Sequence, residues 1–99
     1  MTTPTQPNPP VAPVQLTDAE KVTRDLTAAT DSVTLINGLI SANANIQDTN
    51  ISSRITANYK HLELVLVRPW VANAAAAGTS LTAYTEAIAS AKTYLGVTG

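Results

Sequence analysis

The stretch LTDAEKVTRDLTAATDSVTLINGLI, residues 16–40, decides the fold. Apolar residues recur along it at steps of four and three, which is the spacing of one buried face of an α-helix. These residues are Val22, Leu26, Ala29, Val33, Ile36 and Ile40. Leu35 and Leu39 widen this face, which suits a bundle better than a two-stranded coiled coil. The pattern predicts a helix over residues 17–43 in an all-α fold, a small three-helix bundle.

Local signals place the ends of this helix. Thr17 stands three residues before Glu20, the spacing of a capping box in which each residue satisfies a backbone amide of the other. The pair Asn37-Gly38 resembles a turn signal, yet the apolar face resumes at Ile40. We therefore interpret Gly38 as a glycine inside the helix, at a cost of about 1 kcal/mol. A helix end at Gly38 is the alternative.

A second helix is predicted over residues 49–68, after a connection rich in turn-forming residues and with Asp48 or Asn50 as its cap. Its apolar face is formed by Ile51, Ile55, Tyr59, Leu62 and Leu66. Residues 62–67 are apolar on every side except at Glu63, which is more apolar surface than a small bundle easily covers. A buried strand over 64–67 is the alternative, but no partner strand accompanies it.

The remainder of the chain predicts two further helical segments. Pro69 suits the first position of a short helix over 69–77, because proline lacks the amide that this position leaves unpaired. A third long helix is predicted over 80–95, starting at Thr79 or Ser80 and ending at Gly96. Its apolar face is formed by Leu81, Tyr84, Ile88, Ala91 and Leu95.

The N-terminus has a different composition, which divides the chain into an arm over 1–16 and a helical bundle domain over 17–99. Five of the six prolines lie here: Pro4, Pro7, Pro9, Pro10 and Pro13. Such a segment is expected to be an extended polyproline-type arm, reaching about 45 Å, that binds a neighbouring subunit. Two P-x-x-P matches also fit a ligand for SH3-type grooves, but the arm lacks the basic residue that usually flanks them.

The composition offers few residues for a catalytic, metal-binding or nucleic-acid-binding site. The formal net charge is −1, only 13% of residues are charged, and there is no cysteine. Six basic residues offset by seven acidic ones form no phosphate-binding stripe, so nucleic acid is not expected as the main partner. Low charge instead favours dense packing of subunits. No apolar run reaches the roughly 18 residues of a membrane span, and no signal peptide is recognisable.

No catalytic, cofactor-binding or metal-binding residue is predicted, and the chain is not expected to be an enzyme. His61 is the only histidine, too few for a zinc site, and is interpreted as structural or solvated. The carboxylates are spread along the chain and are interpreted as solvated helix faces. They are Asp18, Glu20, Asp25, Asp31, Asp48, Glu63 and Glu86.

Trp70 is the single residue most open to interpretation. As the only tryptophan, placed where the apolar second helix ends, it could anchor an interface or fill a small core. The residues expected to contact a partner are Pro4, Pro7, Pro9, Pro10, Pro13, Val14, Leu64, Val67 and Trp70.

The composition is similar to that of many small virion proteins of tailed bacteriophages, although no motif identifies a family. The leading hypothesis is a structural subunit of a large assembly, such as a capsid decoration, collar or tail protein. Its partners would be copies of itself or other structural subunits, with no membrane and no small-molecule substrate. The expected location is the virion, or the cytoplasm if the chain is not viral. The alternatives are a soluble helical adaptor with an apolar groove around the second helix and Trp70, and a small subunit of an enzyme complex.

Overall fold

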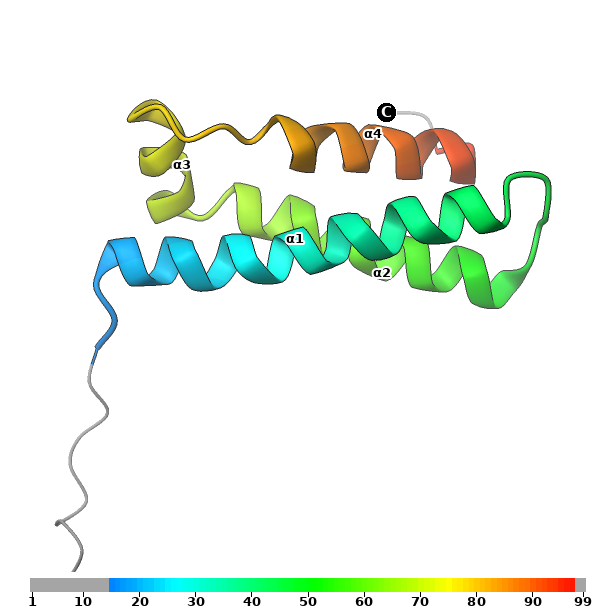
Figure 1. Ribbon diagram of the computed structural model, residues 1–99, viewed down its shortest axis with the longest axis horizontal. Helices are drawn as coiled ribbons and strands as arrows, with labels where there is room; N and C mark the ends of the chain where they lie inside the picture. The colour runs from blue at the N-terminus through cyan, green and yellow to red at the C-terminus, as the bar shows by residue number, and fades with distance from the viewer. Residues whose placement is uncertain (1–14, 98–99) are drawn as a thin grey trace, which may run out of the picture.

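The computed structural model describes residues 15–97, and this part of the chain folds into four α-helices without a strand. They are α1 (Asp18–Ala42), α2 (Thr49–Leu66), α3 (Pro69–Ala76) and α4 (Thr82–Leu95). The three long helices lie side by side and α3 is turned across one end of them (Figure 1). The all-α prediction is confirmed. The helix count is four because the segment that starts at Pro69 is a helix of its own, and residues 64–66 are helical rather than a strand.

The first helix begins as the capping box predicts. Thr17 Oγ1 accepts from the Glu20 amide at 3.2 Å, and Glu20 Oε1 accepts from the Thr17 amide at 2.9 Å. The helix passes through Gly38 without a break, so the alternative end at that residue is wrong. It stops at Asn43, whose backbone amide reaches back to the Leu39 and Ile40 carbonyls.

The other helix ends also follow local chemistry, with one exception. Asp48 caps α2, because its Oδ1 accepts from the amides of the second and third residues after it. Pro69 opens α3, and Gly96 ends α4 in the left-handed conformation at φ 72°. The predicted start of α4 at residue 80 is wrong: the helix begins at Thr82, after Leu81. Since Leu81 packs against the core, tertiary contact sets this start.

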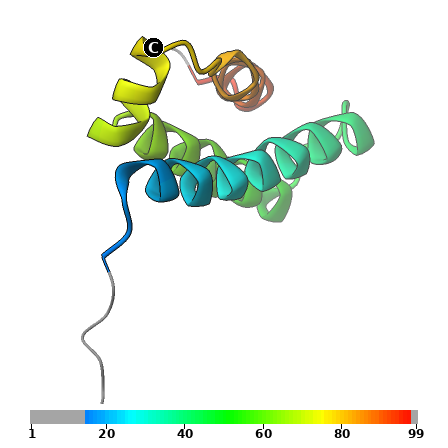
Figure 2. The ribbon, with the colours of Figure 1, turned by 60° about the vertical axis from the view of Figure 1, so that its left-hand side comes forward.

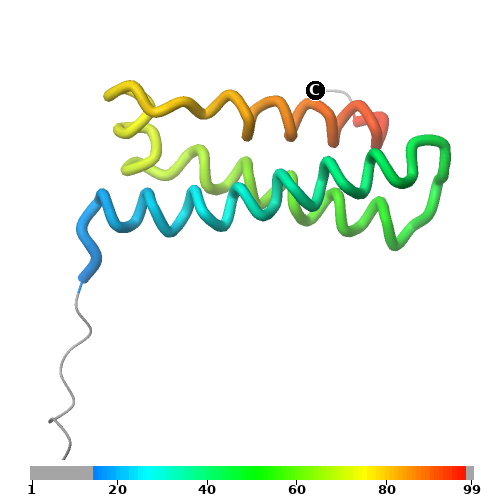
Figure 3. Tube along the Cα trace, in the orientation of Figure 1, coloured from blue at the N-terminus to red at the C-terminus, as the bar shows by residue number. Residues whose placement is uncertain are grey.

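The core runs between the three long helices and extends under α3, which contributes Val71. Its largest fully buried side chains are Ile36, Ile55, Leu62, Val65 and Val71. Buried alanines at 29, 87 and 91 leave room for α4 to approach α1 closely. The chain runs along α1, back along α2 and forward again along α4 (Figure 3), while the rotated view shows α4 resting over the α1–α2 pair (Figure 2). The start of α1 therefore lies at the same end of the bundle as the end of α2 and as α3.

Candidate functional site

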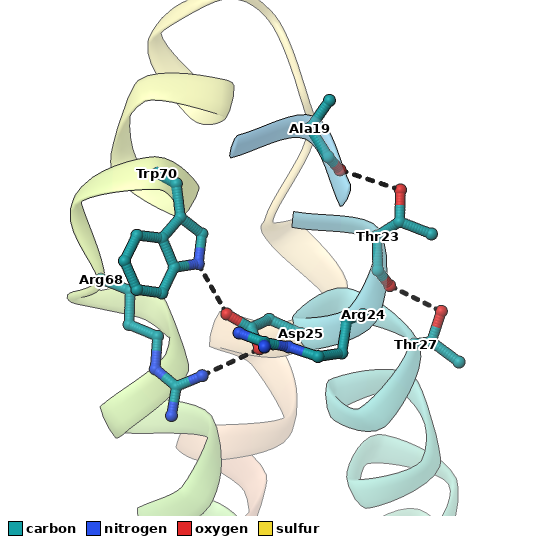
Figure 4. Close-up of polar contacts among 7 residues, drawn as sticks. All are labelled: Ala19, Thr23, Arg24, Asp25, Thr27, Arg68 and Trp70. Carbon is teal, nitrogen blue, oxygen red and sulfur yellow. Dashed lines mark hydrogen bonds and ion pairs between the residues drawn. The ribbon is translucent and has the colours of Figure 1, made fainter. Parts of the chain in front are cut away.

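A buried carboxylate lies at the end of the bundle where α3 crosses. Asp25, on α1, is only 4% exposed. Its Oδ2 accepts a hydrogen bond from the Trp70 indole nitrogen at 2.6 Å, and its Oδ1 lies 2.8 Å from Arg68 Nη1. Arg24 Nε also donates to Oδ1, at 3.1 Å. Figure 4 shows Trp70 and Arg68 converging on Asp25 from the α3 side. We call Arg24, Asp25, Arg68 and Trp70 the Asp25 cluster.

The turn between α2 and α3 brings the two distant donors of this cluster together. Arg68 is the N-cap of α3, with extended backbone, and Pro69 follows at the first helical position. Proline disfavours helical backbone in the residue before it, so α2 stops and the chain turns toward α1. The indole ring of Trp70 packs half-buried against the core, and Lys21 Nζ lies 4.7 Å from its centroid. Trp70 thus contacts α1 through its ring and through its nitrogen.

The cluster holds Asp25 ionised. Burial raises the pKa of Asp25, but the hydrogen bonds from Trp70, Arg68 and Arg24 together outweigh it and bring the pKa to about 2. Both carboxylate oxygens are occupied by donors. A carboxylate with so low a pKa is a poor general base, because catalytic pKa values lie near the working pH. The arrangement therefore attaches α3 to α1 through an ionised carboxylate.

This result corrects the interpretation of Asp25 as a solvated carboxylate, and it was not foreseen from residue type. A position-based signal exists nevertheless. Residues 22, 25, 29, 32 and 36 follow steps of three and four, so Asp25 and Ser32 fall on the buried face of α1. A charged residue at such a position is rarely buried without a partner. Looking for distant basic and donor residues would have identified Arg68 and Trp70 as candidates.

A second polar contact joins α1 to α2. The hydroxyl of Ser32, 6% exposed, lies 2.9 Å from His61 Nδ1. His61, within α2, is half-buried where this helix contacts α1, which agrees with a structural role. A serine hydroxyl next to a histidine has the composition of a nucleophile and its base. Here the hydroxyl of Ser32 is enclosed between two helices, so a substrate has no access to it. Its effect is to satisfy two polar groups at the helix interface.

The residues that the sequence analysis expected to contact a partner differ in how exposed they are. Leu64, on the outer side of α2, is 56% exposed, and Val67, the C-cap that follows α2, is 73% exposed. We call these two residues the Leu64–Val67 patch. Trp70 instead packs on the core and donates to Asp25. The residues predicted in the arm lie outside the described residues: Pro4, Pro7, Pro9, Pro10, Pro13 and Val14.

The opposite end of the bundle is closed by a tyrosine. The hydroxyl of Tyr94, near the end of α4, donates to the carbonyls of Asn43 and Ile46 at 2.9 and 2.7 Å. These carbonyls belong to the loop between α1 and α2. An open hollow beside this loop is bordered by residues such as Gln47, Ser52 and Thr93. Its lining is mostly polar and includes one charged residue, Asp48, the cap of α2.

Comparison with protein-family models, with curated proteins and with solved structures found no match. Within residues 15–97, no group of three or more His, Cys, Asp or Glu side chains is placed to hold a metal ion. Over the same residues, none of the helices combines the length and the apolar character that crossing a bilayer requires.

Proposed function

We propose that the chain is a non-enzymatic structural subunit of a large multi-subunit assembly. The observation that carries this proposal is the Leu64–Val67 patch, two large apolar side chains exposed one helical turn apart. Contact with another protein would remove this apolar surface from water, which is favourable. A virion of a tailed bacteriophage is the assembly that the composition favours, with the chain as a decoration, collar or tail protein.

The way the bundle uses its polar groups supports this role. The buried carboxylate of Asp25 and the buried hydroxyl of Ser32 are both satisfied within the chain, by Trp70, Arg68 and His61. The polar groups best placed for chemistry thus act in holding helices together. With only 13% charged residues, the surface suits close packing against other subunits.

The adaptor alternative is less well supported. It requires a groove in which Trp70 is available to a partner helix, together with the second helix. The indole nitrogen is bonded to Asp25, Lys21 lies over the ring, and the ring packs against the core. A partner at this point would have to displace contacts that the chain already makes.

The proposal is tested by fractionation. Large particles from the source of the protein are separated on a density gradient, and the chain is quantified by mass spectrometry in every fraction. We expect it in the particle fractions at a fixed ratio to the other particle proteins, in several copies. Recovery in the low-mass fractions alone would refute the structural role. A low-mass protein of the same source serves as the control for trapping.

A further inference from the structure

We propose that the Leu64–Val67 patch of one copy binds the N-terminal arm, residues 1–14, of a second copy. This interaction rests on the structural role proposed above, since exchange of arms would join copies within the assembly. Four properties support it: the neutrality of the patch, the chemistry of the arm, the position of the two, and the length of the arm.

Two of the three charged side chains beside the patch are ion-paired within the chain, and the third, Lys60, lies over a tyrosine ring. Lys60 Nζ lies 5.4 Å from the centroid of the Tyr59 ring. Glu63 Oε2 lies 3.2 Å from Lys92 Nζ, and Arg68 is paired with Asp25 at 2.8 Å. An uncharged segment can therefore cover the patch without separating Glu63 or Arg68 from its ion-pair partner, which would be costly. A charged partner would gain little there.

The arm has the complementary composition. No acidic or basic side chain precedes Asp18, and the arm carries two valines, Val11 and Val14, beside its five prolines. A proline-rich segment is held close to the extended polyproline conformation before it binds. Less conformational entropy is then lost on binding, which is why such segments serve as ligands for apolar surfaces.

The point where the arm is attached and the length of the arm also support binding at the patch. Because α1 and α2 run in opposite directions, α1 starts at the end of the bundle where α2 finishes (Figures 1 and 3). The arm is therefore attached at the end of the bundle that carries the patch, and two neighbouring copies can exchange arms there. Fourteen extended residues reach about 43 Å. The 18 residues of α2 span about 27 Å, so the arm can cross a neighbouring α2 entirely.

The acceptor is a second copy rather than the arm's own bundle. Residues 15–17 lead away from the bundle (Figure 1), and the backbone of Thr17 is extended, at φ −69° and ψ 163°. To return to its own α2, the chain would have to reverse its direction just before these residues, which leave the bundle. Binding to a neighbour requires no such reversal.

Disulfide trapping tests the contact directly, because the natural chain has no cysteine. One full-length chain carries Val11→Cys and another carries Val67→Cys, and the two are mixed under mild oxidation. We expect a mixed disulfide to form at least about tenfold faster than with a chain carrying Ile46→Cys, whose position is exposed at the far end of the bundle. Equal rates for the two acceptors would overturn the proposal.

Removing the patch gives a second, independent measurement. The full-length Leu64→Ser/Val67→Ser chain should retain its helical circular dichroism, because both side chains are largely exposed. Sedimentation should show self-association weakened by about tenfold or more, since the apolar surface that the arm covers is lost. The Ile46→Ser chain is the matched control and should associate as the natural chain does. Unchanged association of the double variant would refute arm binding at this patch.

The two proposals can fail separately. If the chain is found in particles and the Leu64→Ser/Val67→Ser chain enters them equally well, the arm binds elsewhere and only the present inference is wrong. If the chain is absent from particles but Val11→Cys and Val67→Cys chains still cross-link, arm exchange stands and the structural role is wrong.

Discussion

The indole nitrogen of Trp70 donates to Asp25 Oδ2 at 2.6 Å, and so joins α3 to α1 across 45 residues of chain. Arg68 reaches the other oxygen of the same carboxylate. Since Trp70 is the only tryptophan, its fluorescence reports on this contact without labelling. The Asp25 cluster is therefore both a stabilising feature and a direct probe of folding at this end of the bundle.

Replacing Asp25 by asparagine should destabilise the protein. In asparagine an NH₂ group replaces one carboxylate oxygen, so its N–H groups would face the N–H group of Trp70 or of Arg68. Arg68 would also lose the negative charge that it pairs with. Hydrogen bonds to charged groups contribute more than neutral ones, so we expect a loss of about 2 kcal/mol in the free energy of unfolding. Urea unfolding, followed by circular dichroism and Trp70 fluorescence, measures it. Asp31→Asn, at an exposed position of the same helix, should change stability by less than about 0.5 kcal/mol. Equal losses for the two variants would contradict a special role for Asp25.

Stability should fall in acid over a defined range. The pKa of Asp25 is lowered from 3.8 to about 2 in the folded protein, so the unfolded chain binds more protons between these values. The contribution of Asp25 is fully present above about pH 4 and is lost as the pH falls toward 2. Urea unfolding at a series of pH values tests this, and Asp25→Asn should flatten the dependence. A natural chain whose stability is constant from pH 4 to 2 would be inconsistent with the ionised cluster.

The same substitution at two threonines of α1 should have different effects. Thr17→Ala removes the cap and should cost about 1 kcal/mol, because the Glu20 amide loses its acceptor. Thr27 lies on the exposed side of the helix, where its hydroxyl donates a hydrogen bond to the Thr23 carbonyl of the preceding turn (Figure 4). Alanine has the higher helix propensity, so the change should be neutral or stabilising by up to about 0.7 kcal/mol. Thermal unfolding of both variants decides, and a neutral Thr17→Ala would show that the cap is dispensable.

Two glycines should likewise respond in opposite directions to alanine. Gly38 lies within α1, and a Cβ there would meet nothing within 4 Å. Gly38→Ala should therefore stabilise the protein by up to about 1 kcal/mol. Gly96 has the same free space but a φ of 72°, so Gly96→Ala should destabilise it by about 1 kcal/mol. Chemical denaturation of the two chains provides the comparison; a destabilising Gly38→Ala would mean that the helix is strained at that residue.

Most of the fold was predictable because its signals are local. The Thr17–Glu20 cap, the Asp48 cap, the Pro69 start and the Gly96 end depend on residues within one helical turn, and all four are confirmed. The start of α4 was not predictable in this way. It depends on how Leu81 fits the core, which is set by the other helices.

The polar contacts lay beyond local reasoning for a related reason. Asp25 was classified by its charge alone, although its position falls on the buried face of α1. Its donors come from the α2–α3 junction, and they reach it only because α1 and α2 pack in opposite directions with α3 turned across their end. The exposed Leu64 and Val67 agree with the excess of apolar residues recognised in that part of α2.

The two polar contacts between α1 and the α2 side have a common spacing. Asp25 precedes Ser32 by seven residues, and Arg68 follows His61 by seven. The two contacts, Asp25–Arg68 and Ser32–His61, therefore lie about two helical turns apart and fit the same antiparallel alignment of the chain segments. Apolar side chains alone tolerate many alignments, because they interact without direction. Sliding α2 by one turn so that Leu64 lies opposite Asp25 would leave the buried carboxylate without its bond to Arg68. A bundle with so few charges thus uses two of its polar pairs to exclude misaligned forms of itself.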